Sequence, residues 1–501
     1  MAPGRVNSQS VTGQYSRRKG GSPLLVGYGE DSGVTVGRFF LKVAVASAVV
    51  VGFCTPANAE TLNEALARAY RNNPTLNAER ARQRATDEQV PQAKSGWRPV
   101  ISSEASVTHR WDISRQTDSQ IIGGDFVSKQ IYKTDESSPA SLSIQLAQPI
   151  FRGFKTVEGI KAAEANVEAG RQQLLSVEQD ILFRAVQAYM NVIRDRKILQ
   201  LRKQNVSVLQ EQLSAAQQRF EVGEVTRTDV ELARARVSQA QSGVASARAQ
   251  LESSVASYHT LVGKAPGTLK QPTPIKGPKA LRSALSEAQK INPNILAAAS
   301  VADSARHSVE VTKGDLLPEA TVRASATTTD DWSIRGGLRT TALVQGVLSV
   351  PIYDGGRTYS GVRQAKQVAS QRRIQIIEAT RSVRESVTTA WNNLHAARSS
   401  IVSAKAQVAA SQSAFNGVRE EYLVGSRSTI DVLNAQQELL NAKIALVAAE
   451  RDQIVASYQL LGSMGKLTAR NLHLRTSIYN PRKHYDGVKD KWIGLDAETV
   501  E

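Results

Sequence analysis

Side chains that could carry catalysis or hold a metal are few in this sequence and badly spaced for either task. No two of the six histidines stand at a spacing such as i, i+4 that suits a shared metal ion. They are His109, His259, His307, His395, His473 and His484. The G-x-S-x-G motif of serine hydrolases is absent, and the single cysteine, Cys54, lies near the N-terminus. We therefore predict that the protein is not an enzyme and holds no metal or cofactor.

Polar residues gather after two glycines that stand in similar surroundings. Gly223 follows Val222 in the stretch RFEVGEVTRTDV (219–230), and Gly425 follows Val424 in EYLVGSRSTIDV (421–432). A glycine between two helical patterns favours a turn. An aspartate six residues later suits the start of a returning helix, where its carboxylate accepts backbone N–H bonds. These aspartates are Asp229 and Asp431.

The two glycine turns belong to two copies of one pattern. LNEALARAYRNNPTL (62–76) aligns with LRSALSEAQKINPNI (281–295) at an offset of 219 residues. QPIFRG (148–153) aligns with VPIYDG (350–355) at an offset of 202, and so do the two turns. The first copy therefore has 17 extra residues between Arg110 and Ala140, in a polar Gly/Ser/Asp segment that we expect to be a long loop.

Each copy is expected to contain two strands. Alternation of apolar and polar residues predicts strands near 100–111, 141–150 and 319–327, and a less regular alternation predicts one at 341–350. About ten residues are enough for a tilted strand to cross a bilayer. The four strands are therefore long enough to span a membrane.

Each copy also contains a helix of unusual length. No proline lies between residues 150 and 265 or between 352 and 480, and proline is the residue that breaks helices most strongly. We predict long helices over 151–222 and 357–424, each followed by its turn and a return helix. At 1.5 Å per residue the first would be about 108 Å long. No single globular core can use such a rod, so it must pair with other helices.

These elements divide the chain into four parts. The first repeat covers residues 60–279 and ends in a proline-rich linker, 264–279, and the second repeat covers 280–479. A polar C-terminal tail, 480–501, is expected to be only partly ordered. An N-terminal extension and a signal peptide occupy residues 1–59.

The N-terminal part has the order of a secretory signal peptide. Arg38 and an apolar run, 43–53, precede a small-x-small cleavage site that ends at Ala59. The polar stretch before Arg38 is long for a signal, which leaves open either a long n-region or a later start codon. Lipidation of Cys54 is the lesser alternative, because Phe53 before it is not small.

Charge and hydropathy limit how the chain meets nucleic acids and membranes. The net charge is +17, but Lys and Arg are scattered without a block of five or six, so we predict no nucleic-acid binding. No run of 18 apolar residues follows Ala59, so a membrane crossing would use strands. Spanning strands must form a closed barrel, which four cannot do alone. Two chains would supply eight strands and three would supply twelve; the trimer, with its lumen, is favoured but not fixed.

Taken together, these features resemble the TolC family of outer-membrane efflux proteins. The resemblance covers residues 60–465 and is carried by the Asn73-Pro74 helix, by QPIFRG and VPIYDGG, and by both glycine turns. Residues 491–495, KWIGL, resemble alphaproteobacterial TolC homologues. The resemblance implies a mainly α fold with a small β part. Long helical hairpins would form a periplasmic α-barrel, and four strands per chain would join a twelve-stranded transmembrane β-barrel of a homotrimer.

The resemblance also implies a function and partners. The chain would be the outer-membrane channel subunit of a tripartite efflux or type I secretion system, extending into the periplasm. It would lie in outer-membrane lipid and dock onto a periplasmic adaptor and an inner-membrane pump of the RND or ABC type. The patterns do not identify the cargo, which the pump selects.

At the two turns the resemblance implies a periplasmic gate. In the family, residues of the second turn bind residues of the first turn in the closed state, and an acidic residue of the second turn forms a ring in the trimer. Both turns of this chain match these positions. Where the family archetype has a second acidic ring this chain has an asparagine, so a cation block by two rings is not carried over. Ordinary capping of helix ends is the alternative. The expected gate residues are Tyr422, Arg427, Asp431, Asn434, Thr228 and Asp229, and the expected docking turns are Val222, Gly223, Val424 and Gly425.

Two other functions remain open at this point. A periplasmic adaptor also uses long helical hairpins, but it would lack four membrane-length strands and a doubled pattern. A trimeric surface adhesin would show one coiled-coil stalk with an anchor. Heat-resistant trimers in outer-membrane fractions would separate a channel from an adaptor.

Removal of the leader can be tested directly. We predict that the mature protein begins at Glu60 and carries no lipid, because the small-x-small site ends just before it. N-terminal sequencing of protein purified from outer membranes should return Glu-Thr-Leu-Asn. A blocked N-terminus at Cys54 would contradict this prediction.

Overall fold

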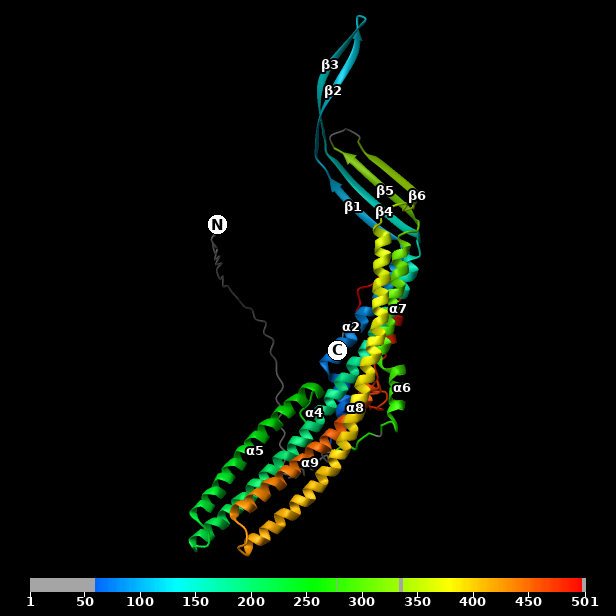
Figure 1. The fold of residues 1–501 in the computed structure, drawn as a ribbon. Coiled ribbons are helices and arrows are strands. Elements are labelled where there is room, and N and C mark those ends of the chain that lie inside the picture. The colour runs from blue at the N-terminus through cyan, green and yellow to red at the C-terminus, as the bar shows by residue number, and fades with distance from the viewer. Residues whose placement is uncertain (1–58, 276, 333–336, 498–501) are drawn as a thin grey trace, which may run out of the picture. The chain divides into compact units, whose positions relative to one another are not determined.

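The computed structural model describes residues 59–275, 277–332 and 337–497, so all of the predicted signal peptide except Ala59 lies outside the described residues (Figure 1). The first half contains α1 (Leu62–Asn72), α2 (Pro74–Asp87), α3 (Gln89–Lys94), the 3-10 helix η1 (Ser95–Trp97), β1 (Val100–Val107), β2 (Arg110–Ile122), β3 (Asp125–Ser137), β4 (Pro139–Arg152), α4 (Lys155–Glu221) and α5 (Arg227–Val262). The second half contains α6 (Leu281–Ile291), α7 (Pro293–Gly314), β5 (Glu319–Asp331), β6 (Arg339–Ser349), α8 (Arg357–Leu423), α9 (Thr429–Ser463) and α10 (Pro481–Val488). This mainly helical fold with a small β part is the predicted one.

Two strands from each repeat form one antiparallel sheet in the order β1-β4-β5-β6. Residues that lie directly opposite one another share a face of the sheet. One such row is apolar across all four strands and consists of Ile101, Leu146, Ala324 and Val344. The next row lies on the other face and consists of Ser102, Gln145, Ser325 and Leu343. The sheet therefore has one apolar face and one mostly polar face, and β1 and β6 are its edges.

The prediction of a long loop between Arg110 and Ala140 was wrong. It is not a long loop but a hairpin in which β2 pairs with β3, while the first predicted strand ends earlier, at Val107. Gly123 and Gly124 turn the chain with φ of 68° and 99°, which only glycine adopts without strain. A Gly-Gly pair after an alternating stretch was the signal for this hairpin.

The long helices form two hairpins that pack side by side. α4 and α8 have 67 residues each, and α5 and α9 return along them with 36 and 35. α4 begins at Lys155 rather than at 151, because β4 continues to Arg152 and Gly153 and Phe154 turn with φ of 56° and 62°. α7 lies along α4 and α8, and α9 packs on α4 (Figure 1). Within the described residues, no helix is both long and apolar enough to cross a membrane.

The main core is a cluster of buried residues from α1, α4, α5 and α9. Leu66, Leu182 and Tyr258 are fully buried there. Glu60 is tied into this core by its side chain and its backbone: the Tyr258 hydroxyl donates to its carboxylate at 2.9 Å and the Tyr189 hydroxyl donates to its carbonyl at 2.8 Å. The residue that follows the predicted cleavage site is thus a fixed part of the fold.

Part of the C-terminal tail forms α10, which contacts the first repeat. α10 packs on α2, where His484 Nδ1 lies 3.1 Å from the buried Asp87 carboxylate. Tyr485 packs against the small cluster of Val90, Ala163 and Val167. These contacts fix α10 on the first repeat.

Candidate functional site

The two helical tips have the same backbone geometry. Gly223 and Gly425 have φ of 80° and 81°. Glu224 N–H donates to the Arg219 carbonyl at 2.8 Å, and Ser426 N–H donates to the Glu421 carbonyl at 2.9 Å. These six-to-one bonds are the usual way to end a helix with a glycine in the left-handed conformation. The two turns are therefore built by the local sequence rather than by partners elsewhere.

Each return helix then begins with a capping box, in which Thr226 or Ser428 is the N-cap residue and the aspartate three residues later binds back to it. The Thr226 hydroxyl and backbone N–H donate to Asp229 Oδ2 at 2.7 and 3.0 Å. The Ser428 hydroxyl and N–H donate to Asp431 Oδ2 at 2.7 and 3.1 Å. The Thr226 hydroxyl lowers the pKa of Asp229, and the Ser428 hydroxyl lowers the pKa of Asp431. Both carboxylates are thus held in the ionised form at the positive ends of helices.

The start of the second return helix lies near the first tip. The hydroxyl of Thr429, which is buried at the start of α9, contributes to the lowered pKa of Asp229. Asp229 is therefore part of the cap of α5 and is also influenced by α9. Sequence analysis had singled out Asp229 but not Thr429.

Arg427 and Tyr422 contact their own surroundings within the single chain. Arg427 Nε donates to Glu421 Oε2 at 2.7 Å, inside the second tip. Arg219, from the end of α4, lies over the Tyr422 ring at 4.9 Å. Thr228, which we expected as a partner of this pair, is exposed. The contact of Arg427 and Tyr422 with Thr228 and Asp229 remains a prediction for the assembled protein.

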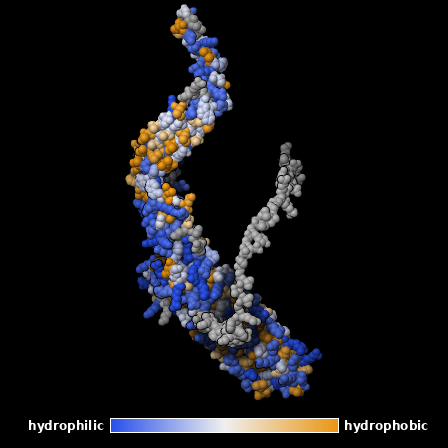
Figure 2. Space-filling model, turned by 180° about the vertical axis from the view of Figure 1, so that it is seen from behind, coloured by the Kyte–Doolittle hydropathy of each residue, from blue (hydrophilic) through white to orange (hydrophobic). Residues whose placement is uncertain are grey.

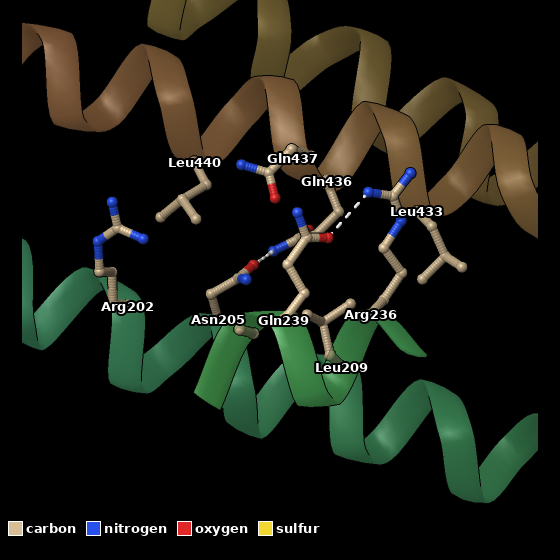
Figure 3. A pocket seen from close by; sticks show the side chains of 10 residues that line it. Arg202, Asn205, Leu209, Arg236, Gln239, Leu433, Gln436, Gln437 and Leu440 are labelled. Atoms are coloured by element: carbon tan, nitrogen blue, oxygen red, sulfur yellow. Dashed lines mark hydrogen bonds between the residues drawn. The ribbon is translucent and has the colours of Figure 1, made fainter. Parts of the chain in front are cut away.

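A polar cluster joins the two hairpins above the tips (Figure 3). Gln436 on α9 donates to Asn205 on α4 at 3.0 Å, and both side chains are buried. Arg236 on α5 donates to Asn434 at 3.0 Å. The cluster surrounds a small cavity of about 90 Å³. Leaving a buried amide unpaired costs about 1–3 kcal/mol, so this pair favours one register of α9 on α4.

Sequence analysis had marked Asn434 only as a missing acid. The structure assigns it a partner, since its side-chain oxygen accepts a hydrogen bond from a guanidinium on the other hairpin. Asn205, Arg236 and Gln436 were missed. A polar residue within a long helix gives no sign of being buried until the helix that covers it is known.

The ends of both hairpins are apolar at their outermost points. Val222 and Val424 are 71% and 80% exposed, and Leu423 is 58% exposed. Single exposed apolar residues need no explanation, but a set of them at the tip of a polar hairpin is suited to docking. Among the described residues, no group of three or more His, Cys, Asp or Glu side chains is placed to hold a metal.

Comparisons with known proteins agree on one family. The model of the family described as "Outer membrane efflux protein" matches residues 65–264 and 284–466. Outer membrane efflux protein BepC of Brucella suis biovar 1 is 39% identical over 462 residues, which cover 91% of this chain and 97% of BepC. Outer membrane protein TolC of Escherichia coli K12 is 27% identical over 441 residues, covering 84% and 85%.

A relative named for secretion and a solved channel also match. Alkaline protease secretion protein AprF of Pseudomonas aeruginosa is 26% identical over 361 residues, covering 70% of this chain and 74% of AprF. The crystal structure of the Campylobacter jejuni CmeC outer membrane channel superposes with a TM-score of 0.69 at 16% identity, covering 85% of this chain and 89% of CmeC. This last likeness shows a shared fold.

The caps at the tips should respond to acid and to truncation. Both aspartates have a folded-state pKa below the usual 3.8, so their stabilisation is fully present above that value and is lost as pH falls through the lower folded pKa. At neutral pH, Asp229→Ala should also speed hydrogen exchange of the backbone amides at the tip, because the cap loses its acceptor. Asp229→Asn keeps an acceptor and should change the exchange less. Hydrogen exchange of peptides that cover 219–232, corrected for intrinsic rates, measures both effects. Equal protection in all three proteins would remove Asp229 from the cap.

Proposed function

The chain belongs to the outer membrane efflux protein family, and from this membership we propose that three copies form one export duct that is gated at its helical tips. The chain is an outer-membrane channel protein of the efflux and secretion type, with a helical part that extends into the periplasm. The observation that carries the proposal is the four-stranded sheet with one apolar face and two open edges, continuous with helices of 67 residues.

The open edges support an assembly of several chains. In lipid, the unpaired N–H and C=O groups of β1 and β6 would each cost several kcal/mol. Joining β6 of one copy to β1 of the next satisfies both edges and repeats until the barrel closes. Two copies would give an eight-stranded barrel, and side chains would fill its interior. Three copies would give a twelve-stranded barrel with an open lumen. The polar face, with Ser102, Gln145 and Ser325, then lines that lumen.

The tips support a gate because their contacts are exposed and can be exchanged. Within one chain Arg427 is bound by Glu421 and Asp229 by Thr226. In the closed trimer, Arg427 and Tyr422 would exchange these partners for Thr228 and Asp229 across a tip contact. Exposed ion pairs contribute little individually. A closed state made from such pairs can be preferred and yet be opened by a partner that binds the open form better.

The exposed tip residues are the proposed docking points for partners. Val222, Gly223, Val424 and Gly425 form the ends of the two hairpins and would meet a periplasmic adaptor, which in turn joins an inner-membrane pump of the RND or ABC type. The printed names of the relatives include both efflux and protease secretion, so the family name alone does not select the cargo. The family and the matched relatives are channel proteins, which is in keeping with a passive duct rather than an enzyme.

The number of copies can be measured. We expect native mass spectrometry in mild detergent to give three chains, because only closed edges are tolerated in lipid. A stable monomer with an intact β signal in circular dichroism would contradict the proposed assembly.

The gate can be tested by single-channel recording in planar bilayers. Replacing Arg427 by Ser and Tyr422 by Phe should raise the conductance, because the closed tip loses its links while the caps at Asp229 and Asp431 remain. The matched control is Arg384→Ser, which removes an arginine from the middle of α8. Unchanged conductance of the double variant, with the trimer intact by mass, would leave both residues as parts of their local helix ends.

Ion preference is expected to depend on Asp431, since three carboxylates at one level form an acidic ring. Asp431→Ala should weaken cation selectivity. Asn434→Asp should strengthen it only modestly, because Arg236 lies within hydrogen-bonding reach of position 434. Combining Asn434→Asp with Arg236→Gln should produce the larger effect. The reversal potential in a salt gradient measures each case, and no difference among them would exclude both positions from the ion path.

A further inference from the structure

The C-terminal segment 492–495 exposes three large apolar side chains that nothing in the proposed function uses. Trp492 is 66% exposed, Ile493 91% and Leu495 fully exposed at 102%. These residues are the middle of the KWIGL motif that the sequence analysis singled out. A cluster of this kind on an otherwise polar tail indicates a binding surface.

The segment is held in a defined place by the residues around it. Arg98 Nη1 donates to the Lys491 carbonyl at 2.9 Å, and the Arg98 guanidinium lies over the Trp492 ring at 4.7 Å. Just before it, Asp490 pairs with Lys94 at 2.6 Å, at the end of α3. α10 is fixed on α2 through His484 and Asp87. The tail thus fastens the segment to η1, directly ahead of β1.

The position of η1 relates the segment to the apolar face of the sheet. Gln148 Nε2 donates to the Trp97 carbonyl at 3.0 Å. Gln148 follows Leu146 on the same face of β4, because residues two apart in a strand share a face. The residue after Trp97 is Arg98, whose guanidinium lies over the Trp492 ring. Trp97 and Trp492 are therefore linked, by one hydrogen bond and one ring contact, to the edge of the apolar face that adjoins the helices.

Apolar side chains gather over this sheet and its junction with the helices (Figure 2). Beyond the row of Leu146, this face continues with the row of Gln148, Val322 and Gly346. In its last row Phe151, Ala320 and Leu348 lie opposite one another. β4 and β6 end one residue later, and β5 begins there, so the apolar face ends close to η1 and to the Arg98 that contacts Trp492.

We propose that residues 492–495 insert into the periplasmic leaflet of the outer membrane and anchor the C-terminal tail to a phospholipid surface. Indole rings favour the headgroup level of a bilayer, where the ring is apolar and its N–H stays hydrated. Ile493 and Leu495 supply the surface that gains from leaving water. Lys489 and Lys491 flank the segment, but Asp486 and Asp496 lie 3.0 and 3.5 Å from them. Apolar burial rather than charge is therefore what drives the insertion.

This anchor depends on the membrane location of the sheet but not on the gate. A neighbouring copy of the chain is the other occupant that could cover Trp492, and the experiment separates the two. The hydrogen bond from Gln148 to the Trp97 carbonyl places the segment beside β4, which is an interior strand. This position favours lipid, because a partner subunit would join through the edge strands β1 and β6.

Brominated phospholipids, which quench tryptophan on contact, provide the test. The full-length mature protein is reconstituted into vesicles of phosphatidylethanolamine and phosphatidylglycerol with bromines near the headgroup end of the acyl chains. We expect Trp492→Phe to remove part of the quenchable emission that the wild type shows. The matched control is Trp391→Phe, in the middle of α8, which should leave the quenchable part unchanged. If Trp492→Phe also leaves it unchanged, Trp492 does not meet lipid and the proposal is overturned.

A second measurement distinguishes water from a partner subunit. The single cysteine, Cys54, lies in the predicted leader, so in a protein that begins at Glu60 Ile493→Cys and Lys483→Cys can each carry one nitroxide. The measured quantity is the ratio of two collision rates with the nitroxide, that of oxygen, which enters lipid, and that of a nickel complex, which stays in water. We expect this ratio to be several-fold higher at position 493 than at position 483. Water-like collisions at 493 would mean a free tail, and protection from both reagents would mean a protein contact; either result overturns the anchor. Mass spectrometry of the same sample reports the trimer separately, so failure of assembly cannot be mistaken for failure of the anchor.

Discussion

Every peptide group that enters lipid must have a hydrogen-bond partner, and the sheet of one chain meets that demand only in its interior. β4 and β5 are paired on both sides, whereas β1 and β6 are paired on one side only among the described residues. The strand pairing of β4 with β5 also joins the two sequence repeats. Duplication therefore supplies the sheet with two strands from each copy but does not close its edges. The proposed assembly of several chains rests on this backbone chemistry, before any side chain is considered.

The same constraint extends into the helical part. Each strand of the sheet continues into one helical segment: β1 follows η1, β4 leads to α4, β5 follows α7 and β6 leads to α8. Neighbouring strands lie about 4.8 Å apart, while packed helices lie about 8–10 Å apart. Strands and helices can share one ring only if the chain bends where they join. Gly153 and Phe154 make that bend after β4, and Gly355 and Gly356 make it after β6, all with positive φ.

Much of this architecture could be predicted because it is repetitive and local. Absence of proline marks the long helices, alternation marks the sheet, and paired glycine turns mark the tips. Features that depend on a distant partner could not be predicted. The burial of Asn205 against Gln436 needs α9 on α4, and the packing of α10 on α2 needs Asp87 opposite His484. The β2–β3 hairpin is different, because it could have been predicted from the Gly123-Gly124 turn. The segment was predicted to be a loop because its composition is polar.

The burial of the contacts between the helices decreases along the hairpins toward the tips. This decrease affects how a gate at the tips could work. The apolar core holds α1, α4, α5 and α9 through fully buried side chains such as Leu66 and Leu182. Nearer the tips, the polar pair of Asn205 and Gln436 fixes the register of the hairpins at little cost in apolar area. At the tips themselves the contacts are mainly capping bonds, the ion pair of Arg427 with Glu421 and the ring contact of Arg219 with Tyr422. A movement confined to the last turns would break few buried contacts, so the polar cluster is the natural point at which such a movement ends.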